Sequence, residues 1–514
     1  MSSSLTTRPR LLAALTWSAA VAALIFALFH AHGFDDPFTT YRYSENLARG
    51  LGFVYNPGER VLSTTTPLYT LLLVVPRLLG LDLPLTSMAI SSAALAAGGL
   101  LLFLLGCQLH TPLAGLVAML LYPLTPLLLP TLGAETALYC TLILGSFLAY
   151  ARNRPLTTAL LLALATLTRA DGILAAGVIG LAAFLQIFQN GHEDTKTQSS
   201  HIFPNLRAFA PSWKKDRATS LPNLRAFASS WLTGLALYTA IVAAWHLFAW
   251  AYFGSPLPAT LAAKQRQGSM LISDSFAQGL LDLAQAYWAQ PLLQLQLLAA
   301  LAGLIYALGW RRGWLPLVAW GVIYAAAYSA LGVTRYFWYY GPLAPVLFAL
   351  LGLAIQALVA LIRSRPLAWA GAIAGTALLA WPLLAALPGQ VARIDSRLAI
   401  YQAAGAWLRA NTPAEATVGT LEVGVIGFYA QRPIVDFAGL IQPDIAQEIG
   451  PASDYGDLTA WAFTRYQPDF LVLRAPAPPQ LAALPDFQQH CAERHQLTNS
   501  GYEGTLIIYA CSGL

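Results

Sequence analysis

The chain has 514 residues, of which 57% are hydrophobic and only 10% are charged, and its formal net charge is +5. Soluble globular proteins carry about 25% charged residues, so this composition excludes a soluble protein and predicts a polytopic membrane protein. Arginines beside apolar segments account for most of the positive charge, as the positive-inside rule produces, and they give no support to a nucleic-acid partner.

The first apolar segment, residues 11–31, is long enough to cross a bilayer and is not followed by a cleavage site of the A-x-A kind. We therefore expect a retained membrane helix. Further apolar segments lie at residues 67–81, 84–105, 113–129, 137–151, 156–167, 173–187, 231–253, 291–308, 315–331, 340–361 and 367–387.

Basic residues predict the orientation, because Lys and Arg gather in cytoplasmic loops. Those expected on the cytoplasmic side are Arg8, Arg10, Arg152, Arg154, Lys214, Lys215, Arg311, Arg312, Arg363 and Arg365. The assignment fails at residues 67–105, where two apolar segments lie between loops that require an odd number of crossings. Either one of the two segments is re-entrant, or the turn near His110 is misplaced. With one of the two not crossing, about eleven membrane helices remain, the N-terminus lies inside and the C-terminus lies outside.

We expect a multi-spanning domain at residues 1–388, with outer loops at 32–66 and 254–290 and a cytoplasmic loop at 190–231. From residue 389 the hydropathy falls, and the pattern predicts an extracytoplasmic α/β domain, residues 389–514. It should contain a helix at 398–410 and strands at 418–421, 434–437, 470–473 and 505–509. Cys491 and Cys511 fall in this domain, and the sequence leaves open whether they pair in an oxidising compartment.

Two adjacent carboxylates, Asp35 and Asp36, directly follow the first apolar segment. Carboxylates at the edge of the hydrocarbon are costly, so the pair predicts a functional site. The alternative is that they cap a helix beginning near Pro37. A free carboxylate here can act as a general base toward a substrate hydroxyl, or bind a hard divalent cation such as Mg²⁺ or Mn²⁺. Without a Cys or His cluster, a zinc site is not expected.

Other charged residues accompany the pair on the predicted outer face. Lys264 is the only one of the four lysines expected there, and it suits a lipid phosphate or an interfacial anchor. Arg335 and Arg169 are further cations, although Arg169 with Asp171 also fits a local pair in a turn. Glu135 begins an apolar segment on the same face. The aromatic run 336–340 is typical of an interfacial belt, and aromatic faces also suit sugar rings.

The stretch 35–43 with 52–61 resembles the first outer loop of GT-C membrane glycosyltransferases, and most closely the terminal arabinofuranosyltransferase type. Residues 133–139, 167–172, 252–264, 424–429 and 435–440 follow in the order of that family. The chain departs from the family pattern at Ala170, Ala259 and residues 62–65. These positions surround the expected donor site, so they bear on the sugar more than on the reaction class.

The resemblance implies a GT-C fold and an inverting transfer of arabinofuranose or a mannose-like sugar. The donor is a polyprenyl phosphate sugar, and the acceptor is a glycan, glycolipid or protein of the cell envelope, outside the plasma membrane. Asp35 or Asp36 would supply the base. Lys264, Arg335 and Arg266 would bind the donor phosphate, and the expected substrate-binding residues are Tyr41, Arg42, Tyr55, Glu135 and Arg169.

Two other functions remain open at this point. A lipid or solute transporter could use the acidic pair to couple a cation, but transporters place ionisable residues near the bilayer midplane, whereas these lie at segment ends. A non-catalytic envelope scaffold is the other alternative, because fold does not dictate activity.

Overall fold

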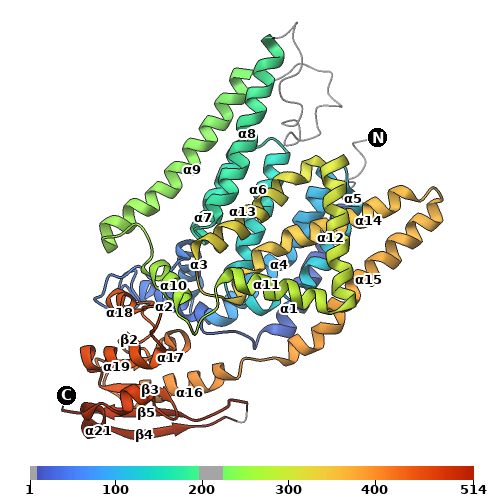
Figure 1. Cartoon of the computed structure of the whole chain (residues 1–514). Helices are drawn as coiled ribbons and strands as arrows, with labels where there is room; N and C mark the ends of the chain where they lie inside the picture. Colours follow the sequence, from blue (N-terminus) through green and yellow to red (C-terminus); the bar gives the residue numbers. More distant parts are fainter. Residues whose placement is uncertain (1–7, 196–223, 500, 514) are drawn as a thin grey trace.

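The computed structural model describes residues 8–195, 224–499 and 501–513. A bundle of helices comes first and a small domain with a sheet follows it (Figure 1). Most of the predicted cytoplasmic loop 190–231 lies outside the described residues. At its borders, α8 (Gly172–Thr195) continues to Thr195 and α9 (Leu224–Phe253) begins at Leu224, so both helices reach into the predicted loop.

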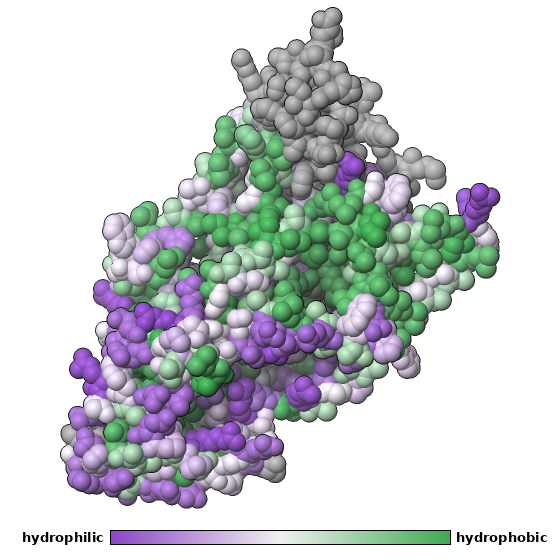
Figure 2. Space-filling model, in the orientation of Figure 1, coloured by the Kyte–Doolittle hydropathy of each residue, from purple (hydrophilic) through white to green (hydrophobic). Residues whose placement is uncertain are grey.

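Seven helices in the described part of the chain are long and apolar enough to cross a membrane. They are α1 (Arg8–Phe29), α4 (Leu83–Gln108), α9, α12 (Pro291–Trp310), α13 (Leu315–Leu331), α14 (Ala344–Leu361) and α15 (Arg365–Ala392). Shorter apolar helices stand beside them: α3 (Pro67–Leu78), α5 (Pro112–Leu121), α6 (Thr136–Ala151), α7 (Pro155–Thr168) and α8. Hydrophobic side chains cover the visible bundle surface and hydrophilic ones cover the C-terminal domain (Figure 2). The chain is therefore a multi-pass membrane protein.

The two apolar segments within residues 67–105 form helices of very different length. α3 has 12 residues and extends about 18 Å, well short of a hydrocarbon core of about 30 Å. α4 has 26 residues, enough to cross. α3 packs against α2 (Asp36–Ala48), with Tyr69 and Leu73 fully buried. α3 is thus the segment that does not need to cross, and the total of eleven crossings stays a prediction.

The C-terminal domain follows α15, which runs to Ala392, beyond the predicted boundary at 388. Its sheet has the order β2-β1-β3-β5-β4. The strands β2 (Ile434–Asp436), β1 (Val418–Thr420) and β3 (Phe470–Arg474) are parallel. β5 (Leu506–Cys511) pairs antiparallel with β3, and β4 (Cys491–Leu497) pairs antiparallel with β5. The helices are α16 (Ser396–Asn411), α17 (Val423–Ala430), α18 (Pro443–Glu448), α19 (Tyr455–Tyr466), α20 (Pro479–Ala482) and α21 (Pro485–His490). A disulfide joins Cys491 to Cys511.

The C-terminal domain docks on the end of the bundle where α2 lies, which we call the domain end. The side-chain amide of Asn56 donates to the carbonyl of Ile434 and accepts from its N–H group, both at 2.9 Å. The Tyr55 hydroxyl donates to the carbonyl of Val423 at 2.5 Å. On a second side, Gln267 of α10 (Ala259–Ser269) donates to the carbonyl of Ala438 at 3.0 Å. The domain therefore contacts both helices that carry the charged residues described next.

Candidate active site

Asp36 is the first residue of α2, and Pro37 follows it at the first turn. Proline suits this position because its fixed φ matches a helix and the missing N–H would have no partner there. The N-terminal end of a helix also favours a carboxylate, since unpaired N–H groups point toward it. The side chain of Asp36 is 43% exposed, although most of α2 is buried. Asp36 is thus a carboxylate held on a rigid element and open to a ligand.

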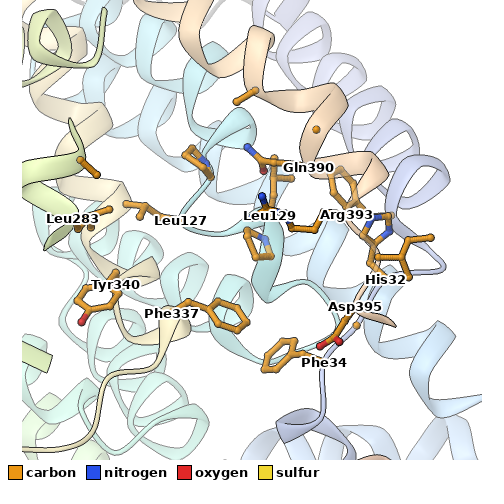
Figure 3. A pocket seen from close by; sticks show the side chains of 18 of the residues that line it. His32, Phe34, Leu127, Leu129, Leu283, Phe337, Tyr340, Gln390, Arg393 and Asp395 are labelled. Carbon is orange, nitrogen blue, oxygen red and sulfur yellow. The ribbon is translucent and has the colours of Figure 1, made fainter. Parts of the chain in front are cut away.

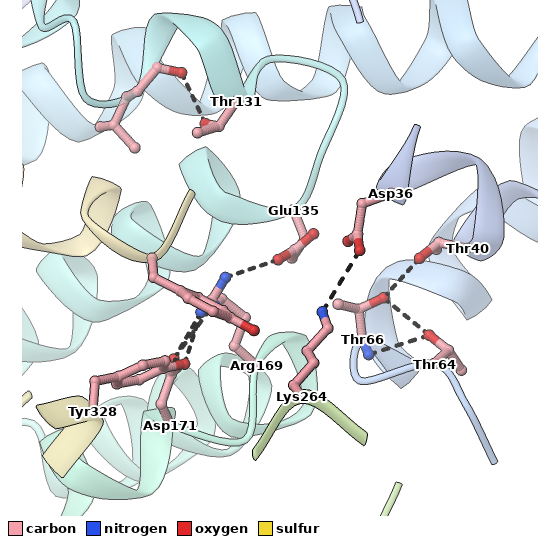
Figure 4. A network of polar contacts seen from close by, with 12 residues as sticks. Asp36, Thr40, Thr64, Thr66, Thr131, Glu135, Arg169, Asp171, Lys264 and Tyr328 are labelled. Carbon is pink, nitrogen blue, oxygen red and sulfur yellow. Dashed lines mark hydrogen bonds and ion pairs between the residues drawn. The ribbon is translucent and has the colours of Figure 1, made fainter. Parts of the chain in front are cut away.

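Lys264 of α10 faces this carboxylate, with Nζ 3.6 Å from Oδ1 of Asp36 (Figure 4). The ammonium lies 5.3 to 5.8 Å from the ring centres of Tyr336, Trp338 and Tyr339. Burial lowers the pKa of Lys264, but Asp36 and the tyrosines outweigh it and raise that pKa above its usual value. Lys264 is therefore a fixed positive charge in an aromatic cage.

A second charged cluster lies beside this pair. Arg169, which follows α7, pairs with Glu135 at 3.1 Å and with Asp171 at 3.0 Å, and Tyr328 of α13 donates to Asp171 at 2.5 Å. The predicted local pair of Arg169 and Asp171 is thus present, and Arg169 also reaches Glu135. Burial raises the pKa of Glu135, Arg169 opposes the shift, and Asp36 adds to it. Figure 4 shows that Asp36, Glu135 and Lys264 face a common space.

Asp35 has a different role from its neighbour. Its carboxylate accepts hydrogen bonds from the backbone N–H groups of Gly424 at 2.9 Å and Val425 at 2.7 Å, at the N-terminus of α17. The Asp35 side chain makes no capping hydrogen bond on α2, so the structure does not support the alternative that it caps its own helix. Burial, and then Glu422, raise the pKa of Asp35 to about 7, against these hydrogen bonds. Asp35 caps a helix of the other domain.

Gly424 allows α17 of the C-terminal domain to approach the backbone of Asp35 closely. A Cβ atom there would come within 1.9 Å of the Asp35 carbonyl oxygen. One turn later, a Cβ at Gly427 would come within 1.8 Å of the Tyr55 hydroxyl. Both glycines let α17 lie against the loop that carries the acidic pair.

Replacing Asp35 by alanine is expected to destabilise the protein without touching the open site. The N–H groups of Gly424 and Val425 would lose their acceptor, at a cost on the order of 2 kcal/mol. We expect a lower Tm and faster proteolysis in the linker 393–395. Asp274→Ala is the control, because the Asp274 side chain is 59% exposed and its surface ion pair contributes little. A Tm for Asp35→Ala equal to that of the control would contradict the role of Asp35 in holding α17 against the helix bundle.

Three predicted substrate-binding residues are buried and already partnered. The Tyr41 hydroxyl donates to the carbonyl of Gly133. Arg42 donates to the carbonyls of Tyr55 at 3.3 Å and Arg432 at 3.4 Å. Tyr55 binds Val423, as described above. In this geometry Tyr41, Arg42 and Tyr55 support the loop and the docked domain. Their role in substrate binding stays a prediction.

Two predicted phosphate-binding residues are also engaged elsewhere. Arg266 donates to the carbonyl of Gln447 at 2.5 Å in the C-terminal domain. Arg335 pairs with Asp282 at 2.7 Å and Asp274 at 3.2 Å. Of the three predicted phosphate ligands, the structure brings only Lys264 to Asp36.

The carboxylates do not form the donor set that a resident divalent cation needs. Such a cation takes six or more oxygen ligands, or a few carboxylates and several waters. Both oxygens of Asp35 accept backbone hydrogen bonds, and Asp36 faces an ammonium. Within residues 8–195, 224–499 and 501–513, no group of three His, Cys, Asp or Glu side chains could hold a metal ion. The residues around Asp35 and Asp36 therefore do not fit the predicted Mg²⁺ or Mn²⁺.

Sequence reasoning missed the partners that complete the site. Tyr328 had no local signal, because it joins Asp171 from a helix far along the chain. The aromatic run 336–340 was visible as a belt, and the structure turns three of its rings toward Lys264.

Comparisons with known proteins find matches for the fold. The model of a domain of unknown function, DUF8728, matches residues 391–507, and no curated protein matches the chain. The archaeal oligosaccharyltransferase AglB from Archaeoglobus fulgidus, solved with an inhibitory peptide and a dolichol-phosphate, is 12% identical with a TM-score of 0.57, over 89% of this chain and 69% of its own.

A second solved structure matches over nearly its whole length. ArnT from Cupriavidus metallidurans, bound to undecaprenyl phosphate, is 13% identical with a TM-score of 0.54, over 97% of this chain and 98% of its own. The Archaeoglobus fulgidus oligosaccharyltransferase was also solved with Zn and sulfate, at a TM-score of 0.55 and 13% identity, over 89% of this chain and 68% of its own. These likenesses confirm the GT-C fold.

Proposed function

We propose that this chain, which has the GT-C fold, is an inverting glycosyltransferase. It moves a sugar from a polyprenyl monophosphate donor to a cell-envelope glycan, glycolipid or protein on the outer face of the plasma membrane. Asp36 is the general base and Lys264 stabilises the departing phosphate. The C-terminal domain then lies outside, which agrees with its Cys491–Cys511 disulfide, because such bonds persist in oxidising compartments.

The observation that carries the proposal is the pairing of a half-exposed carboxylate with a caged ammonium, 3.6 Å apart. Glycosyl transfer from a phosphate needs both groups: a base for the acceptor hydroxyl and a positive charge for the phosphate. Glu135, fixed by Arg169, faces the same space and suits hydroxyl groups of the sugar.

In the proposed reaction each of these groups has one task. The acceptor oxygen attacks the anomeric carbon while its proton passes to Asp36. The bond from that carbon to the phosphate oxygen breaks, and its electron pair leaves with the phosphate beside Lys264. Attack and departure occur on opposite sides of the carbon, so its configuration inverts. The donor enters between Asp36 and Lys264, which separates the ion pair.

The neighbours support a lipid-linked donor. The AglB structure contains a dolichol-phosphate and the ArnT structure contains undecaprenyl phosphate. Both ligands are polyprenyl phosphates, and a multi-pass membrane protein can meet such a lipid within the bilayer. A transporter is the weaker alternative, because Asp36, Glu135 and Arg169 all lie at helix ends, whereas transporters bind near the midplane.

The donor assignment is tested with purified protein in detergent. Polyprenyl-phosphoryl arabinofuranose and polyprenyl-phosphoryl mannose are supplied in parallel, with an envelope lipid extract as acceptor. Consumption of either donor with release of polyprenyl monophosphate supports the proposal and identifies the sugar. No consumption of either donor, with Mg²⁺ present as well as absent, contradicts it.

Chelation is expected to leave this activity nearly unchanged, since Lys264 occupies the position next to Asp36 where a cation would bind. EDTA treatment followed by the donor assay should alter turnover by less than about twofold, a difference below 0.5 kcal/mol. A loss of more than about tenfold that added Mg²⁺ or Mn²⁺ restores would show that a divalent cation takes part.

A further inference from the structure

A large cavity opens at the domain end of the bundle, beside the pair of Asp36 and Lys264. Its volume is about 1280 Å³, above the roughly 300–1,000 Å³ of ordinary small-molecule sites. Its lining includes the end of α1 at Phe29, the end of α15 at Gly389 and Gln390, and α11 (Phe276–Ala289) at Leu283. Because α1 and α15 are candidate membrane helices that end here, the cavity lies where membrane meets water.

An aromatic wall separates this cavity from the caged lysine. Phe34 lines the cavity and packs on Phe337 at 5.1 Å and Trp338 at 5.3 Å between ring centres. Trp338 belongs to the cage of Lys264. Neither Asp36 nor Lys264 lines the cavity. Gly33 and Phe34 both line the cavity, so the segment that leads to Asp36 borders it.

The two sides of the cavity differ in chemistry (Figure 3). Leu127, Leu283 and Phe337 lie on one side, with Tyr340 near them. His32, Gln390, Arg393 and Asp395 lie on the other. The side of Leu127, Leu283 and Phe337 also carries Asp282 and Arg335, which neutralise each other as an ion pair at 2.7 Å. A largely apolar side opposite a polar side, at the level of the headgroups, suits an amphiphile.

The polar side carries one cation that no carboxylate neutralises in the described part of the chain. Arg397 pairs with Asp395 at 2.7 Å, and Arg335 pairs with Asp282 at 2.7 Å. Arg393 lines the cavity and has no ion-pair partner among the described residues. Arg393 therefore favours a negatively charged head group.

We infer that this cavity binds the acceptor of the reaction, and that the acceptor is an anionic lipid-anchored molecule. Its apolar chain lies against Leu127, Leu283 and Phe337, and its acidic head group lies against Arg393. This inference rests on the proposed function. Its reason is geometric: a donor phosphate belongs at Lys264, behind the wall, whereas a head group held beside Phe34 lies next to the segment that carries Asp36.

The inference is tested by photolabelling of the full-length protein in lipid nanodiscs. One probe is phosphatidylglycerol with a diazirine on an acyl chain, and the other is the same lipid with a phosphatidylcholine head group. Labelled peptides are identified by mass spectrometry. We expect the anionic probe to label the peptides of α11 and of the α15 end.

Two variants distinguish the cavity from the general lipid surface. A Cβ at Gly389 meets nothing within 4 Å, so Gly389→Trp places its ring in the cavity without a backbone clash. It should lower labelling at least about tenfold. Gly309→Trp is the matched control, because Gly309 is equally open but does not line the cavity.

Arg393→Gln should lower labelling by the anionic probe about fivefold, as expected for one interfacial charge, and leave labelling by the phosphatidylcholine probe unchanged. Arg363→Gln is its control.

Three results would overturn the inference: labelling that Gly389→Trp does not reduce, an equal effect of Arg393→Gln on both probes, or complete displacement of the anionic probe by equimolar undecaprenyl phosphate. The last result would make the cavity the donor site. Failure of the proposed function looks different, because the donor assay would then fail while labelling persists.

Discussion

Replacing Asp36 by asparagine is expected to lower donor turnover about a thousandfold, within the range of 10² to 10⁴ that a positioned general base contributes. Asparagine keeps the size and the polar contact of the side chain but cannot take the proton of the acceptor hydroxyl. The fold should tolerate the change, because the side chain is 43% exposed. The measurement is kcat for polyprenyl monophosphate release, together with the Tm.

The control for this variant is Asp274→Asn, another exposed carboxylate at the domain end, which pairs with Arg335. Arg335 keeps Asp282 in that variant, so turnover should stay within about twofold of wild type. If Asp36→Asn turned over as fast as this control, Asp36 would not be the base.

Replacing Lys264 by methionine is expected to lower turnover on the order of a hundredfold to a thousandfold, as the loss of one preorganised group that stabilises transition-state charge usually does. Methionine preserves the length of the side chain and its contacts with Tyr336, Trp338 and Tyr339, so the cage remains filled. Because Lys264 also attracts the phosphate of the bound donor, KM should rise together with the fall in kcat.

Arg266→Gln is the matched control for Lys264. Arg266 lies on the same helix but donates to the carbonyl of Gln447, away from Asp36. Its loss should change turnover by less than about threefold. A Lys264→Met variant that lost only affinity, with kcat intact, would limit Lys264 to ground-state binding of the phosphate.

Hydropathy predicted most of the fold because membrane helices carry a strong local signal. The positive-inside rule also located the conflict at residues 67–105, where the structure has a short helix, α3, of 12 residues beside the 26 residues of α4. Which segment crosses the membrane stays a prediction. In the C-terminal domain, α16 and four of the strands fall at the predicted places. β4 was missed because it is an edge strand with a polar sequence, Cys491–Leu497, and lacks the apolar alternation of a half-buried strand.

The candidate site was predictable only in part. The sequence singles out Asp35 and Asp36 as a pair, but it does not separate their roles. That separation depends on α17, almost 400 residues away, whose backbone N–H groups bind Asp35 at 2.7 and 2.9 Å. Likewise, the sequence around Arg335 and Arg266 does not reveal their partners Asp282 and Gln447, which come from other elements.

The cavity had no sequence signal at all, because its sides come from five separate segments of the chain. Phe34, Leu127, Leu283 and Arg393 each look ordinary in sequence. Only the packing of α1, α11 and α15 at the domain end brings them to one space.

The most direct test of this account compares wild type, Asp36→Asn and Asp35→Asn in one assay of polyprenyl monophosphate release, normalised to folded protein. We expect Asp36→Asn to be folded and about a thousandfold slower, and Asp35→Asn to be less stable but to retain turnover per folded molecule. The opposite pattern, an inactive Asp35→Asn and an active Asp36→Asn, would contradict the assignment of Asp36 as the base and of Asp35 as the residue that holds α17 against the helix bundle.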